Sequence, residues 1–205
     1  MDKNKRILKN TVQAKGNIVL DGLKYLPKKN ENSIFTLLYA TQPQPVMSQR
    51  LKSISDFTDA ILKFDPINIK VIIRLHPREV FDYELYNLFF EKLNQFEVEI
   101  DKGEELFSQI NKTDVLVTSY STVSKDAIIL NTPIILQDYY ENDITGLISK
   151  GIAKKSTNSE ELFCLINDIK TGNFKINIIN YENVLKEIYA STDFKVANEI
   201  IKMLN

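Results

Sequence analysis

Short apolar runs rich in β-branched residues alternate along this chain with longer stretches in which apolar and polar positions are mixed. Polar turn residues bound each run, which is typical of strands buried on both faces of a parallel sheet. A weaker run at Gly151–Lys154 predicts one further short strand. The main runs predict strands at Ile34–Thr41, Ile69–Leu75, Phe96–Ile100, Asp114–Thr118 and Pro133–Gln137.

The stretches between these runs have the periodicity of amphipathic helices. They predict helices at about Met47–Phe64, Asp82–Gln95, Glu104–Asn111, Thr122–Leu130 and Ser159–Ile169. Strict alternation of strand and helix is the signature of βαβ units. We therefore expect an α/β fold with a doubly wound, Rossmann-like parallel sheet. Two extra C-terminal helices are expected at about Tyr181–Ala190 and Asp193–Leu204.

Composition narrows the class of function. Lys and Arg total 26 against 27 Asp and Glu, so the chain lacks the basic excess expected of a protein that coats nucleic acid. One His and one Cys exclude a zinc site built from several such ligands. Cys164 lies in an apolar helical pattern and is expected to be buried.

No apolar run approaches the ~20 residues needed to span a bilayer, and the charged N-terminus lacks a signal sequence. The cytoplasm is therefore the expected location. Association with a membrane surface through another part of the protein stays open.

Residues just after each predicted strand are the candidates for chemistry, because ligands of open parallel sheets bind beyond the carboxyl ends of the strands. Thr41 and Gln42 follow the first strand and begin a stiff loop with two prolines. This loop is either a turn leading into a helix or part of a binding site. Arg74, His76, Pro77 and Arg78 close the second strand.

His76 is the strongest single candidate because it lies where the sheet opens onto its ligand crevice. A lone His is often only a packed or surface residue. Beside Arg74 and Arg78, however, an imidazole can bind a phosphate oxygen and stabilise charge on a departing nucleotide. We therefore prefer a functional role for His76, with Arg74 and Arg78 as substrate-binding neighbours.

The segment after the fourth strand is rich in hydroxyl groups. Ser119, Ser121, Thr122 and Ser124 surround one expected helix start, and capping needs fewer hydroxyls than that. Free amides and hydroxyls at a helix start form an anion site suited to phosphate. Asp126 lies about one turn further along and could reach a ribose, or be an ordinary carboxylate in the first turn.

The run DVLVTSYSTVSKDAIILNTPIIL resembles the donor-site segment of many GT-B glycosyltransferases. The segment RLHP resembles the His-Pro motif of bacterial sialyltransferase-like, Kdo-transferase-like and glycerol- or ribitol-phosphate transferase groups. This resemblance implies that His76-Pro77 and Ser121-Thr122 hold the phosphate of a CMP- or CDP-linked donor, and that Asp126 binds the donor ribose. It implies a nucleotide-activated sugar or polyol phosphate as substrate, surface polysaccharide synthesis as the setting, and neither cofactor nor essential metal.

The resemblance also implies a division of the chain. Residues 1–33 would be a linker from an N-terminal acceptor domain, with Gly16–Asp21 as its entry into the second half. Residues 34–178 would be the Rossmann-like donor domain, and residues 179–205 would be helices that pack back on the absent half. The catalytic base normally belongs to that half, so no residue of this chain is assigned to it.

Two other functions stay open on this resemblance. UDP-GlcNAc 2-epimerases share the fold, although the His-Pro pair favours transferases. The chain could also be a non-catalytic nucleotide-binding subunit that acts with a separate acceptor chain.

Overall fold

The computed structural model describes residues 21, 23, 26, 34–79, 83–101, 103–139, 142–174, 176–188, 195 and 197–198. The chain divides into two compact units. One is Lys28–Tyr181, and the other combines Met1–Pro27 with Glu182–Asn205. Most of the expected linker and most of Asp193–Leu204 lie outside the described residues, although Asp21 Oδ2 accepts a 2.7 Å hydrogen bond from Ala197 N.

Strands and helices alternate as the sequence predicts. Short 3-10 helices occur at Pro66–Asn68 and Glu91–Leu93. In chain order the other elements are β1 (Phe35–Ala40), α2 (Met47–Ile61), β2 (Ile69–Arg74), α3 (Tyr83–Phe90), β3 (Glu97–Ile100), α4 (Leu106–Asn111), β4 (Val115–Thr118), α5 (Val123–Ile129), β5 (Ile134–Gln137), β6 (Ala153–Ser156), α6 (Ser159–Lys170) and α7 (Ile178–Ile188).

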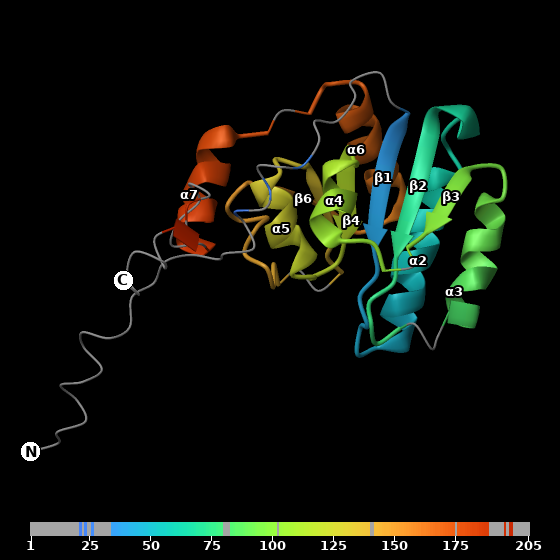
Figure 1. Ribbon diagram of the computed structural model, residues 1–205. Coiled ribbons are helices and arrows are strands. Elements are labelled where there is room, and N and C mark those ends of the chain that lie inside the picture. Colours follow the sequence, from blue (N-terminus) through green and yellow to red (C-terminus); the bar gives the residue numbers. More distant parts are fainter. Residues whose placement is uncertain are drawn as a thin grey trace, which may run out of the picture. The chain divides into compact units, whose positions relative to one another are not determined.

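The strands form one six-stranded parallel sheet in the order β3-β2-β1-β4-β5-β6. Helices α2, α3 and α6 pack together on one face, and α4 and α5 cover the other (Figure 1). The predicted α/β, Rossmann-like, doubly wound fold is confirmed. A helix is absent between β5 and β6, where the connection 138–152 contains turns over its described residues.

Burial on both faces explains why the central strands are almost wholly apolar. In β1, Leu37 and Leu38 are fully buried although neighbouring side chains of a strand point to opposite faces. On the face covered by α2, the Tyr39 ring stacks on Phe57 with centroids 4.0 Å apart. Covering both faces in this way fixes the register of the sheet, because a slip by one residue would exchange the two buried faces.

The expected burial of Cys164 is wrong, because this residue is exposed. Helix α6 buries Leu162 and Ile166, which are four residues apart and therefore share one face. Cys164 lies midway between them in sequence and so projects from the opposite side of the helix.

Candidate functional site

The order of the strands defines where a ligand crevice opens. The chain runs outward from β1 through β2 to β3, and then crosses to β4 on the other side of β1. The winding therefore reverses between β1 and β4, and open α/β sheets bind ligands outside the carboxyl ends of the strands at such a point. The loops after β1, β2 and β4 surround this crevice.

Thr41 joins the ends of β1 and β2. Its side chain is buried, its Oγ1 accepts a hydrogen bond from His76 N at 2.9 Å, and it donates to Glu79 Oε2 at 2.5 Å. The hydroxyl predicted to bind substrate thus positions the backbone of the His-Pro segment. A contact from Thr41 to a donor stays a prediction.

Glu79 is a residue of this site that the sequence analysis missed. It is fully buried and accepts hydrogen bonds from Thr41 and from the Tyr86 hydroxyl. It also forms a 2.9 Å ion pair with Arg50 Nε, which is itself buried in α2. Burial, the hydrogen bond to Glu79 and its nearby charge raise the pKa of Tyr86. The network fastens the loop after β2 to α2 and α3.

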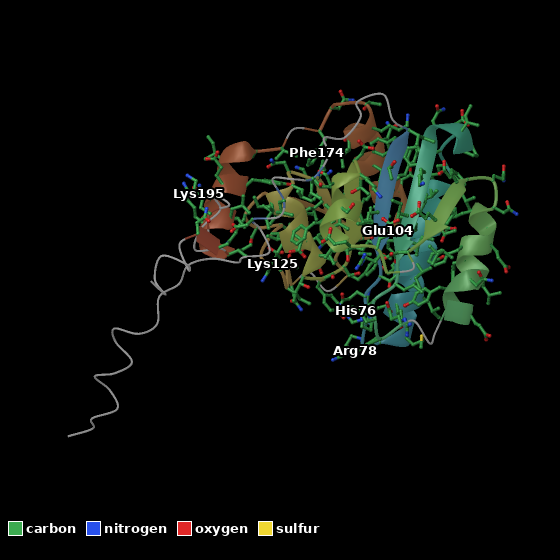
Figure 2. The ribbon with its side chains drawn as sticks, in the orientation of Figure 1. His76, Arg78, Glu104, Lys125, Phe174 and Lys195 are labelled. Carbon is green, nitrogen blue, oxygen red and sulfur yellow. The ribbon has the colours of Figure 1, made fainter. Side chains whose placement is uncertain are left out.

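His76 is half-buried at the carboxyl edge of the sheet, and Figure 2 shows it beside Arg78. Its Nδ1 accepts a 3.2 Å hydrogen bond from Arg78 N, so the proton of the neutral ring lies on Nε2. Within the described part of the chain, Nε2 has no hydrogen-bond partner. His76 therefore presents a donor for a ligand, while Pro77 and Arg78 are exposed next to it.

Arg74 lies at the end of β2, and its partners are on the side of β3. Its Nη1 is 2.7 Å from Asp101 Oδ2 and donates to Glu104 O and Gln109 Oε1, both at 3.1 Å. The structure therefore joins Arg74 to the loop between β3 and α4, and it does not bring this guanidinium together with the hydroxyl-rich segment. Its predicted binding of a donor stays a prediction.

The loop after β4 is tied to the loop after β1. Ser119 is buried, and its Oγ accepts a 3.1 Å hydrogen bond from Gln44 Nε2. The Tyr120 hydroxyl donates to Pro43 O at 3.4 Å. Gln42, in the same β1 loop, is half-buried, and its buried Oε1 has no hydrogen-bond partner in the part of the chain that the structure describes. These contacts assemble the two walls of the switch-point crevice.

The hydroxyls around the start of α5 divide into two kinds. Ser121 Oγ accepts from Val123 N at 3.4 Å, and Ser124 Oγ donates to Ser121 O at 2.7 Å, so these two groups organise the turn. Thr122 occupies the N-cap position but makes no side-chain cap, and it is exposed. Since the Ser121 hydroxyl accepts its bond, its own hydrogen remains to be donated. Asp126 is half-buried in the first turn.

A pocket adjoins this segment at the ends of β4 and β5. The turns between β5 and β6 form its outer wall. Asp143 adopts a φ of 37° there. Burial alone would raise the pKa of Asp143, but hydrogen bonds from Ser149, Ile148 and Thr145 lower it below the ordinary value. The lining residues are Gln44, Ser119, Tyr120, Leu136, Gln137, Asp138, Asp143, Ile144, Thr145 and Ile148.

Among the described residues, no group of three or more His, Cys, Asp or Glu side chains is arranged to hold a metal ion. No helix in that part of the chain combines the length and apolarity required to cross a membrane.

Several solved structures share this fold. A UDP-GlcNAc 2-epimerase from Methanocaldococcus jannaschii, solved with UDP-GlcNAc and UDP, matches with a TM-score of 0.56 and 18% identity over 90% of this chain and 58% of its own. The wall teichoic acid polymerase TagF matches with a TM-score of 0.55 and 15% identity over 91% of this chain and 48% of its own.

A third match is a single domain. The C-terminal domain of the group 1 glycosyl transferase LpcC from Francisella tularensis aligns with a TM-score of 0.52 and 10% identity, over 82% of this chain and 90% of that domain. At these identities the matches establish the fold, here that of a GT-B C-terminal half. The chain spans about half the length of the epimerase and TagF structures that it matches.

Sequence comparison gives the family. No curated protein matches the chain significantly. A sequence model of the family described as CDP-glycerol:poly(glycerophosphate) glycerophosphotransferase matches residues 44–148, which contain the His-Pro segment, the hydroxyl-rich turn and most of the pocket wall. Since this match covers just over half of the 205 residues, the chain belongs to the CDP-glycerol:poly(glycerophosphate) glycerophosphotransferase family.

Proposed function

We propose that this chain binds the donor in the transfer of a polyol phosphate or sugar from a CDP- or CMP-linked precursor. The observation that carries the proposal is the position of His76 and Ser121 on opposite sides of the β1–β4 switch point. His76 Nε2 and the Ser121 hydroxyl are both donors that the scaffold holds in place through bonds to their other atoms. Two such donors suit a phosphate oxygen.

Transfer from a CDP-linked polyol and transfer from a CMP-linked sugar release the same leaving group, CMP. When an acceptor hydroxyl attacks the β-phosphorus of CDP-glycerol, the acceptor oxygen–phosphorus bond forms, and the bond from that phosphorus to CMP breaks. Attack on the anomeric carbon of a CMP-sugar also releases CMP. In each reaction negative charge grows on the departing CMP phosphate. His76, Ser121 and Thr122 would stabilise that charge with hydrogen bonds, and Asp126 would bind the ribose hydroxyls.

Family membership favours CDP-glycerol over a CMP-sugar, because the family description names that donor. The resemblance to sialyltransferase-like enzymes rests on the short His-Pro and Ser-Thr motifs alone. The setting would be the synthesis of a surface polymer, with the acceptor held elsewhere. We assign no cofactor and no essential metal, because the charge of the leaving group is met by side-chain donors.

The acceptor half and the catalytic base would come from another domain or subunit. In this proposal residues 34–178 form the donor domain and residues 179–205 contact that second part. Transfer requires both substrates in reacting geometry, and a single Rossmann-like unit provides one wall of the cleft. Location in the cytoplasm, with any contact to the membrane surface made through the second part, belongs to the same proposal.

An epimerase-like activity is the second candidate, because structures of UDP-GlcNAc 2-epimerases align with the chain over nearly its full length. That similarity concerns the fold, which both classes share. The two functions differ in the nucleotide that they require: cytidine nucleotides for the transferase and uridine nucleotides for the epimerase.

A thermal-shift panel of CMP, CDP, UMP, UDP, GDP and ADP tests the proposal. We expect CMP or CDP to raise the melting temperature at millimolar concentration, because a ligand that binds only the folded chain stabilises it. Stabilisation by UDP alone would favour the epimerase-like function. Stabilisation by purine nucleotides alone, or by none of the six, would contradict a cytidine-linked donor.

A further inference from the structure

Gln44 has a feature that the phosphate site does not explain. It lies in the loop between β1 and α2, is 8% exposed, and lines the pocket at the ends of β4 and β5. Its Nε2 donates to Ser119 Oγ at 3.1 Å. Its Oε1 is buried, and among the described residues it has no hydrogen-bond partner.

A buried amide oxygen without a partner is unusual, because the desolvated group loses its bonds to water without gaining others. The bond to Ser119 fixes the amide, so the other end of the amide is left for whatever enters the pocket. If the amide were turned over, Oε1 would accept from Ser119 and Nε2 would be left instead. A hydroxyl group can serve either arrangement, since it both donates and accepts.

The other lining residues of the pocket indicate which kind of chemical group it can bind. Asp138 and Asp143 lie in its wall, and their negative charges oppose an anionic group. Asp143 is held by backbone donors, at 2.8 Å from Ser149 N and 3.2 Å from Ile148 N, so the wall is a built turn. The apolar side chains of Leu136 and Ile148 offer contact to a carbon skeleton. This combination of acidic and apolar side chains suits an uncharged group that carries hydroxyls.

The place of the pocket identifies which part of a donor would enter it. Ser119 and Tyr120 line the pocket, and Ser121 follows them directly at the proposed phosphate site. In CDP-glycerol the glycerol is joined to that phosphate through the β-phosphate, so the glycerol is the uncharged part of the donor that would extend into the pocket.

We infer that Gln44 is a specificity-determining residue whose side-chain amide hydrogen bonds to a hydroxyl of the uncharged group carried by the donor. The inference rests on the proposed function and adds the contact that distinguishes the whole donor from its nucleotide.

Calorimetric titrations of the full chain with CDP and with CDP-glycerol test the inference, using Gln44→Met as the variant. Methionine keeps the length of the side chain and removes its hydrogen bonds. We expect the affinity for CDP to stay within about twofold, and the affinity for CDP-glycerol to fall by roughly three- to tenfold. Gln49→Met is the matched control, since Gln49 Oε1 is also buried and has no partner among the described residues, but lies outside the pocket lining. It should change neither affinity.

Thermal unfolding of the same variants separates the inference from a structural role. Gln44→Met loses the hydrogen bond to Ser119 Oγ but also removes an unsatisfied buried oxygen, so we expect its melting temperature to change little. Equal loss of affinity for both ligands, no loss for either, or a wild-type chain that binds CDP-glycerol no better than CDP would overturn the role of Gln44 while nucleotide binding stands. A wild-type chain that binds neither ligand would overturn the proposed function and this inference with it.

Discussion

Replacement of Glu79 by alanine is expected to lower the free energy of unfolding by about 3–5 kcal/mol, as the removal of one partner from a buried ion pair does. Glu79 is fully buried, and the guanidinium of Arg50 would be left without its 2.9 Å partner. Tyr86 and Thr41 would each lose an acceptor as well. Urea unfolding measured at equilibrium gives the value.

Glu97→Ala is the matched control for Glu79→Ala. Glu97 pairs with Lys70 at 2.8 Å, but 58% of its side chain is exposed, so its loss should cost under about 1 kcal/mol. Glu79→Gln keeps the volume of the side chain and should give an intermediate loss. Equal, small losses for Glu79→Ala and Glu97→Ala would show that the buried network does not hold the His-Pro segment.

His76→Ala and Ser121→Ala are each expected to weaken the binding of CMP or CDP by about tenfold or more, because a hydrogen bond to a charged phosphate contributes roughly 1.5–3 kcal/mol. Cytidine, which lacks the phosphate, should bind both variants almost as it binds the wild type. If both groups contact one phosphate, the double variant should lose less than the sum of the two single losses. Calorimetric affinities for the four proteins provide the test.

Stability measured on the same proteins distinguishes binding from packing. A Ser that only organises the start of α5 would cost about 1 kcal/mol of stability and leave the affinity of the folded protein unaltered. Ser55→Ala serves as a control, since Ser55 Oγ donates to Asp59 in an exposed contact within α2. Reduced stability with unchanged nucleotide affinity for His76→Ala and Ser121→Ala would rule out the assigned phosphate site.

The architecture was predictable because parallel strands buried on both faces leave long apolar runs between polar turns. Strand β1 is an example: every residue from Thr36 to Ala40 is buried, and its expected bounds differ from the observed ones by one residue at each end. The sixth strand was placed less well, at Gly151–Lys154 instead of Ala153–Ser156. Gly151 has a φ of 68° in a turn, and two lysines interrupt the apolar pattern of this edge strand.

The arrangement of the candidate site was only partly predictable. Position after a strand was enough to place His76 and Ser121 at the carboxyl edge of the sheet, because parallel topology brings strand ends to one edge whatever the details of packing. Glu79 carried no such signal, since a Glu in a polar loop is usually solvated and its buried partner Arg50 is remote in sequence. The partners of Arg74 were unpredictable for the same reason, since Asp101 and Gln109 approach it through tertiary packing.

The location of nucleotide binding can be measured directly by amide chemical-shift mapping of the isotope-labelled chain during titration with CDP. We predict that the amides of Ser121, Thr122 and Val123, together with those of His76 and Arg78, shift with one common dissociation constant. The amides of Ile67 and Asn68, which precede β2 at the opposite edge of the sheet, should stay in place. Shifts centred on that opposite edge, or unchanged spectra at millimolar CDP, would contradict a donor site at the β1–β4 switch point.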